Sequence, residues 1–273
     1  MKNLIMSAAC GLHPNQIEFF LKSLRQYYDE DIFFLVGKKD TEIKKFLKLY
    51  DCRFLEVDVH KFDIQLKRYS FFLKILQEEE YKNIFFCDSR DIYFQSNPFD
   101  YSYKGAINFF FEDKKIKDCP HNSDWLIKTY GEETYNALSN KIISCGGTIL
   151  GSHQKIKTFL TLMIDEISRH KFKKRLKYML TFRRDKGGRG SDQSHGNYIA
   201  HNNLINNTFF YSNESGPIAT AYHLEKIKFN ENNELINILN EPYAVVHQYD
   251  KRWDKFQDSV NELKKKLGIK QIQ

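Results

Sequence analysis

The first hundred residues alternate between two patterns of hydrophobic and polar positions. Four short apolar runs have the length and composition of buried strands, at residues 3–9, 31–37, 52–58 and 83–88. The segments between them repeat apolar side chains every three or four residues, as amphipathic helices do, at residues 15–28, 41–50 and 68–80. This alternation of strands and helices predicts a mostly parallel central sheet flanked by helices, and therefore an α/β fold.

The rest of the chain shows the same patterns in a less regular order. Apolar spacing predicts three more strands, at 105–113, 142–152 and 243–250. It also predicts helices at 154–182 and near 192–201. Because no internal repeat or long linker appears, we expect a single domain over residues 1–273.

Composition supports a folded chain. Of the 273 residues, 41% are apolar and 15% aromatic, which is enough for a large core. No apolar run approaches the roughly 20 residues needed to span a bilayer, and the first residues are expected to form a strand instead of a secretory signal. Five scattered cysteines without a CxxC pair suggest neither a zinc site nor a disulfide framework. We therefore expect a cytoplasmic location.

The chain carries a net charge of +7, concentrated in residues 170–190 and in the C-terminal tail. Such charge attracts nucleic acid, an anionic membrane surface or a phosphorylated ligand. A solvated helix face would have the same composition, so charge alone leaves the partner open.

The segment NIFFCDSRDIYFQ at 83–95 places charge directly after a buried strand. Buried charge is unfavourable unless it is paired or bound to a metal. In a tight turn, carboxylates three residues apart can point at one cation, and Mg²⁺ and Mn²⁺ prefer oxygen ligands. Asp88 and Asp91 are therefore candidate metal ligands. A surface turn capped by Asp88 is the simpler alternative.

Two later segments add candidate polar groups. In AVVHQYDKRW, His247 ends an apolar strand and Lys251 follows it, which suits a metal ligand and a cation beside a diphosphate. A buried, hydrogen-bonded imidazole is the alternative for this histidine. Asp192 and Gln193 open a helix, where they could face a sugar or an acceptor hydroxyl, or where the acid could serve only as an N-cap.

The order of these motifs resembles that of GT-A-type glycosyltransferases, which use a nucleotide-sugar donor and usually Mn²⁺. Most of them have a D-x-D motif, whereas this chain has DSRD. The D-x-x-D form resembles the glycosyltransferase domain of procollagen lysyl hydroxylases, and the DSRD and HQYDKR pair is similar to bacterial surface-polysaccharide transferases. In that comparison FFFED contributes Glu112, SCGGTILG contributes Gly146 and Gly147, and SDQ contributes Asp192. Lys251 stands where the pattern has Arg.

The resemblance implies a GT-A (Rossmann-like) fold with a nucleotide-binding half at 1–100, a sugar and acceptor half at 101–253, and a basic helix or tail at 254–273. It implies that Asp88, Asp91 and His247 hold Mn²⁺ or Mg²⁺, and that the catalytic groups are Asp192 and Glu112. The donor contacts that follow from it are Ser7, Ala8, Arg68, Ser89, Gly146, Gly147, Gln193 and Lys251.

The expected activity is sugar transfer from a UDP-sugar to a glycan or lipid-linked glycan acceptor, in surface polysaccharide synthesis. A sugar nucleotidyltransferase is one alternative, but SAACGLHPN after the first strand lacks the GxGTR loop that those enzymes share. A non-catalytic, basic polyanion-binding protein is another. The aromatic residues near 170–190 lack the pattern of a stacking platform, so no nucleic acid partner is expected.

The basic segment leads to a first prediction. Its stretch KFKKRLKYMLTFRR mixes cations with apolar side chains, a composition that suits the inner face of a membrane, where a lipid-linked acceptor would lie. The purified protein should sediment with phosphatidylserine vesicles, and the bound fraction should fall as salt rises. Equal sedimentation with neutral phosphatidylcholine vesicles would contradict this prediction, and no sedimentation with either would favour a soluble acceptor.

Overall fold

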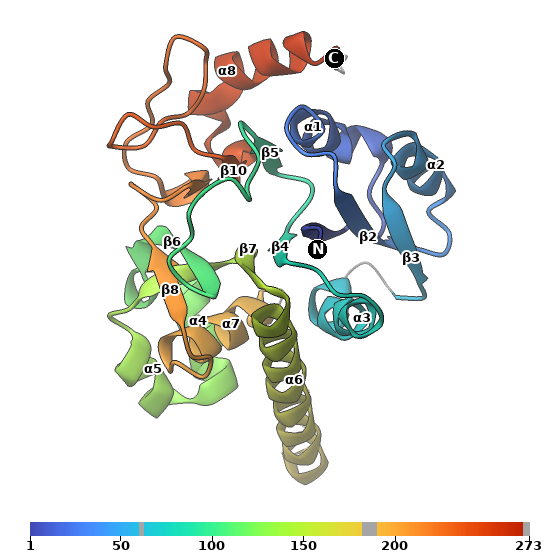
Figure 1. Ribbon diagram of the computed structural model, residues 1–273. Helices are drawn as coiled ribbons and strands as arrows, with labels where there is room; N and C mark the ends of the chain where they lie inside the picture. The colour runs from blue at the N-terminus through green and yellow to red at the C-terminus, as the bar shows by residue number, and fades with distance from the viewer. Residues whose placement is uncertain (60–62, 182–189, 270–273) are drawn as a thin grey trace.

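A seven-stranded sheet runs through the centre of the molecule (Figure 1). The computed structural model describes residues 1–59, 63–181 and 190–269, and for 171–181 it describes the backbone alone. The strand order is β3-β2-β1-β4-β7-β6-β8. These strands are β1 (Leu4–Ala8), β2 (Asp31–Gly37), β3 (Arg53–Val57), β4 (Asn83–Cys87), β6 (Ile107–Lys115), β7 (Ile142–Ser152) and β8 (Thr208–Tyr211).

The first four strands of this sheet are parallel. β1 pairs in parallel with both β2 and β4, and β2 pairs in parallel with β3. The apolar stretch of β2 is buried throughout, because helices cover both faces of a parallel sheet. β7 then runs antiparallel to β4 and β6, so the second half of the sheet is mixed. The mostly parallel α/β sheet expected from the sequence is confirmed.

Helices cover the two faces of this sheet (Figure 1). On one face, α3 (Ile64–Glu78) and α6 (His153–Thr181) pack through side chains such as Phe72 and Phe159. On the other face, α1 (Pro14–Leu24) and α2 (Thr41–Leu49) contribute Phe20 and Leu47 to a second apolar cluster. The remaining helices are α4 (Pro120–Tyr130), α5 (Glu132–Leu138), α7 (Ser191–His201) and α8 (Trp253–Lys266), with short 3₁₀ turns η1 (Ile116–Asp118), η2 (Ala221–His223) and η3 (Tyr249–Arg252).

A small second sheet lies beside the large one and has the order β5-β10-β9. It consists of β5 (Ile92–Phe94), β9 (Ile218–Thr220) and β10 (Val245–His247). β10 is antiparallel to β5, and this register places His247 opposite Ile92. A residue near the end of the chain therefore lies beside the DSRD turn.

Several element boundaries differ from those expected. α3 begins at Ile64, so Arg68 lies in its second turn and not at its start. Glu112 lies within β6, as the strand expected at 105–113 placed it, but this strand continues to Lys115. β10 ends at His247, because Gln248 has a left-handed backbone (φ 58°) and its N–H donates to the Asp91 carbonyl. The sequence patterns did not predict β5, which has only three residues, or α4, α5, β8 and β9, which lie where the apolar spacing is least regular.

All five cysteines are buried free thiols. Among the described residues, none of the helices combines the length and apolar character that crossing a bilayer requires. The side chains of residues 171–189, which make up most of the basic segment, lie outside the described part of the chain.

Candidate metal centre

Three side chains from two sheets meet at the carboxyl edge of the large sheet. Asp88 follows β4, Asp91 immediately precedes β5, and His247 ends β10. One ligand atom from each of them lies within 4.8 Å of the other two. The antiparallel pairing of β5 with β10 explains the meeting, because it sets His247 one residue from Asp91 in register.

The His247 imidazole is oriented for a cation between the two carboxylates. Its Nε2 lies 3.6 Å from Asp88 Oδ2 and 3.6 Å from Asp91 Oδ1, which is too far for good hydrogen bonds. This nitrogen is buried and has no hydrogen-bond partner among the described residues. Its other nitrogen, Nδ1, contacts Cys145 Sγ at 3.3 Å, which holds the ring in place. Two carboxylate oxygens and an unsatisfied imidazole nitrogen fit Mn²⁺, which accepts both kinds of ligand.

Gly147 leaves the space that this arrangement needs. A Cβ atom on Gly147 would lie 2.5 Å from His247 Cε1 and 2.6 Å from Asp88 Oδ2. Its carbonyl also accepts a 2.9 Å hydrogen bond from the Asp88 N–H. Gly146 differs, because a Cβ there would meet Gln193 at an ordinary 3.6 Å. A glycine is therefore required only at position 147, where the side chains of His247 and Asp88 lie close to the backbone.

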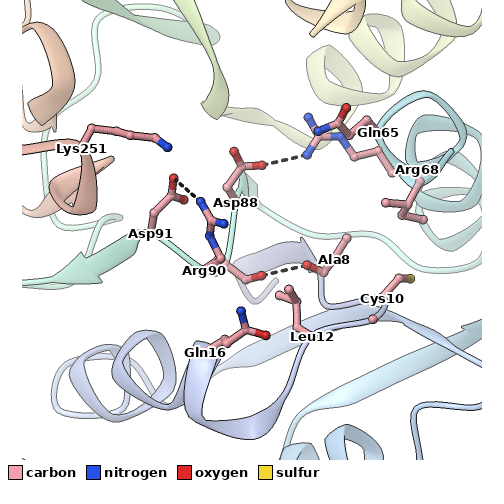
Figure 2. A pocket seen from close by; sticks show the side chains of 13 residues that line it. Ala8, Cys10, Leu12, Gln16, Gln65, Arg68, Asp88, Arg90, Asp91 and Lys251 are labelled. Carbon is pink, nitrogen blue, oxygen red and sulfur yellow. Dashed lines mark hydrogen bonds and ion pairs between the residues drawn. The ribbon is translucent and has the colours of Figure 1, made fainter. Parts of the chain in front are cut away.

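Arg68 is a buried bridge between two acids. Its guanidinium donates to Asp88 Oδ1 at 2.9 Å and to Asp192 Oδ2 at 3.0 Å, and it stacks 4.7 Å from the Phe86 ring centroid. Figure 2 shows the hydrogen bond from the Arg68 guanidinium to Asp88. The Tyr69 hydroxyl also donates to Asp192 Oδ2, at 3.2 Å. The charge of Arg68 is thus shared between two carboxylates and not reserved for a phosphate.

The pKa values of the cluster describe a charged site. Burial raises the pKa of Asp88, but His247 and Arg68 outweigh burial and hold it below its ordinary value. Burial lowers the pKa of His247, whereas Cys145 and the two carboxylates outweigh burial and hold it well above its ordinary value. Without a metal, the neighbouring carboxylates thus favour the protonated form of His247. A cation at the same point would displace that proton, so metal binding and proton release are linked.

A cavity of about 620 Å³ opens beside this cluster (Figure 2). Positive and negative side chains share its wall. Arg90 lies 3.4 Å from Asp250 and 3.8 Å from Asp91, whereas Lys251 makes no ion pair with the described residues. The lining residues are Ala8, Cys10, Gly11, Leu12, Gln16, Ile64, Gln65, Arg68, Asp88, Ser89, Arg90, Asp91 and Lys251.

A second cavity of about 490 Å³ lies beyond the ends of β2 and β3. Cys10 and Gly11 belong to the walls of both cavities, so the two adjoin. The second is lined by Lys38, Lys39 and Asp40. The combined space extends along the carboxyl ends of the parallel strands, where ligands of α/β sheets bind.

The structure separates the expected site residues into two groups. Ala8, Arg68, Ser89, Asp88, Asp91 and Lys251 line the first cavity. Within the described part of the chain, its wall does not include Ser7, Glu112, Gly146, Gly147, Asp192, Gln193 or His247.

Ser7 and Ser89 have hydroxyls engaged in the framework. Ser7 is 1% exposed, and its hydroxyl donates to the Cys87 carbonyl at 2.7 Å, which ties β1 to β4. The Ser89 hydroxyl donates to the Ala8 carbonyl at 2.8 Å, which fixes the DSRD turn against the end of β1. Their geometry thus indicates framework contacts, with Ser89 also at the cavity wall.

Glu112 lies behind the cluster and not at the cavity wall. Its Oε1 accepts from Gln193 Nε2 at 3.0 Å, and its Oε2 lies 3.6 Å from His223 Nε2. Burial raises the pKa of Glu112 to about 7, although Gln193 and the charge on His247 oppose the rise.

Sequence reasoning missed three contributors to the site: Cys145, Tyr69 and Arg90. Each of them is adjacent in the chain to a residue that was identified. Cys145 precedes the glycine pair, Tyr69 follows Arg68, and Arg90 lies inside DSRD. That adjacency was the available signal, but their contacts depend on packing.

No protein-family model matches the chain, and no curated protein shows a significant match to it.

We predict that Gly147→Ala disrupts the metal centre and that Gly146→Ala does not. The new methyl group at position 147 would displace His247 or Asp88, whereas position 146 has room for it. Mn²⁺ affinity, followed by the EPR signal of the free ion, should fall at least about tenfold in Gly147→Ala. Equal affinities in the two variants would show that the cluster does not hold the ion.

A second prediction concerns Glu112 and pH. The pKa of Glu112 is about 7 in the folded chain, above the ordinary value of 4.5. Its protonated form therefore stabilises the folded chain most below pH 4.5, and this contribution is lost as the pH rises through 7. In EDTA, the unfolding free energy of Glu112→Gln relative to that of the parent should increase by about 1–3 kcal/mol when the pH is raised from 5 to 8. Urea denaturation measures this difference.

The matched control is Glu42→Gln, which removes an exposed carboxylate from α2. Its stability should follow that of the parent at both pH values. If Glu112→Gln behaves in the same way as this control, Glu112 is ionised in the folded chain at neutral pH.

Proposed function

We propose that this protein is a metal-dependent glycosyltransferase of the GT-A type. It moves a sugar from a UDP-sugar to a glycan or lipid-linked glycan acceptor, as the motif resemblance implies, in surface polysaccharide synthesis. The observation that carries the proposal is the cluster of Asp88, Asp91 and His247 at the carboxyl edge of the sheet. It adjoins a cavity whose wall also holds Arg68, Arg90 and Lys251.

The shape of the cavities supports a nucleotide donor. In this proposal the base and ribose lie beyond the ends of β1, β2 and β3, near Cys10, Gly11 and Asp40. The diphosphate lies toward Arg90, Lys251 and the metal ligands, where positive charge is available. The two adjoining spaces, about 620 and 490 Å³, are in the size range of small-molecule sites.

The metal ligands and Lys251 have separate roles. Asp88, Asp91 and His247 would hold Mn²⁺ or Mg²⁺, which neutralises a diphosphate and stabilises the charge of the departing UDP. Lys251 adds a fixed positive charge near the leaving group. Arg68 holds Asp88 Oδ1, so the carboxylate keeps one orientation and its Oδ2 would be available to the ion.

Asp192 and Glu112 remain the proposed catalytic groups. Gln193, next to Asp192 in the sequence, donates a hydrogen bond to Glu112. Arg68 ties Asp192 to Asp88, so the position of Asp192 is coupled to the metal centre. Gln193 ties Glu112 to the same helix, α7. A carboxyl with a pKa near 7 is well suited to general-base catalysis at neutral pH.

The proposal predicts metal-dependent nucleotide binding. UDP at 100 times its dissociation constant adds about 2.7 kcal/mol to the stability of the protein that binds it. We expect UDP to raise the melting temperature by a few degrees in the presence of Mn²⁺ and to have little effect in EDTA. An equal shift under both conditions would contradict the assigned metal role.

Variants of the ligands sharpen this test. Asp91→Asn and His247→Ala should each abolish the Mn²⁺-dependent shift and lower sugar transfer by orders of magnitude. The double variant should lose little more than either single one, because all of them remove one shared ion. Asp124→Asn, on the exposed surface of α4, should bind as the parent does. Near-normal transfer by Asp91→Asn would contradict the metal role and would indicate that DSRD is only a surface turn.

A further inference from the structure

A second group of metal-ligating side chains lies between α6 and α7. Glu166 and His170 stand one turn apart on α6, and His195 faces them from α7. These three side chains are buried, with exposed fractions of 4%, 8% and 3%. One ligand atom from each lies within 4.8 Å of the other two. Neither Asp88 nor Asp91 nor His247 belongs to this cluster.

The spacing of the atoms suits a tetrahedral ion. His170 Nε2 lies 3.5 Å from Glu166 Oε2, at the long limit for a hydrogen bond. Two ligands at the usual zinc distances are about 3.4 Å apart around a tetrahedral centre. The Tyr130 hydroxyl, from the end of α4, donates a 3.0 Å hydrogen bond to Glu166 Oε2 and lies 2.8 Å from His195 Nδ1. It therefore holds two of the three side chains in place from one side.

Charge around the cluster also fits a bound cation. A buried carboxylate is unfavourable unless a cation or hydrogen bonds compensate it. Arg169 lies on the surface and contacts Glu166 Oε1 at 2.9 Å, which leaves Oε2 directed at His170 and Tyr130. The arginine thus orients the carboxylate, in the way that outer partners orient metal ligands. Its own charge partly opposes a cation, so the imidazoles must contribute much of the affinity.

We propose that Glu166, His170 and His195 form a second metal site that binds Zn²⁺, with the Tyr130 hydroxyl orienting two of these ligands. Two imidazoles and one carboxylate favour zinc over Mn²⁺ or Mg²⁺, because nitrogen ligands suit the later transition metals. No cysteine takes part, so the scatter of the cysteines does not bear on this site. These three protein ligands leave one position of a tetrahedral zinc ion for a water molecule.

The site would fix the joint between two helices. α7 carries Asp192 and Gln193 in its first turn, and His195 lies two residues after Gln193. An ion shared by α6 and α7 would hold this turn against the body of the protein. The inference does not depend on the proposed transferase activity, because it concerns different residues.

The test begins with the full-length Asp91→Asn/His247→Ala protein, in which the first centre is disabled. After removal of metal with EDTA, the protein is loaded with Zn²⁺ and passed over a desalting column. Elemental analysis should then find one zinc per chain. Co²⁺ in place of Zn²⁺ should give the intense visible absorption of a tetrahedral site, which an octahedral surface site lacks.

In the same background, Glu166→Gln and His195→Ala should each lose the bound ion and the Co²⁺ spectrum. His201→Gln is the matched control, because His201 lies on α7 outside the cluster, with its Nε2 2.9 Å from the Ile142 carbonyl and its ring stacked on Phe210. It should retain both. Absence of zinc from the background protein, or retention of zinc in Glu166→Gln, would overturn the proposal. Glu166→Gln keeps the shape of the side chain, so the test does not depend on whether His195→Ala folds.

Discussion

The buried guanidinium of Arg68 is the interaction on which the rest of the site depends. It joins α3 to the turn after β4 and to the first turn of α7 through Asp88 and Asp192. A buried arginine is tolerable only when its charge is compensated, and loss of one partner would leave an uncompensated charge in the interior. Two carboxylates from distant parts of the chain are therefore held at fixed positions by one cation.

The arrangement around Asp88 follows from this bridge. Asp88 and Asp91 would repel each other if nothing separated their charges. Arg68 takes one oxygen of Asp88 and leaves the other facing His247. The space for that meeting exists because Gly147 has no side chain. A cation among the three side chains would compensate the two carboxylates, whose charge also raises the pKa of His247.

Helix α7 connects the two proposed metal sites. Asp192 in its first turn is linked to the first centre through Arg68. His195, in the next turn, lies beside Glu166 and His170 of α6. Gln193, between these two residues in the sequence, holds Glu112 on β6. A single helix thus carries contacts to the metal centre, to a buried acid and to a neighbouring helix. Its position is set from three directions, as precise placement of functional groups requires.

The sequence alone determined all strands of the large sheet except β8, the helices of the first half and the charged turn at 88–91, because these depend on spacing between neighbours in the chain. It also identified His247 as a partner of that turn by motif order, but only the register of β10 on β5 places the histidine there. Tertiary packing alone decided which glycine is required and where the Ser7 hydroxyl is directed. It also decided that Arg68 meets Asp192, 124 residues away, because such contacts depend on how elements pack and leave no periodic trace in the sequence.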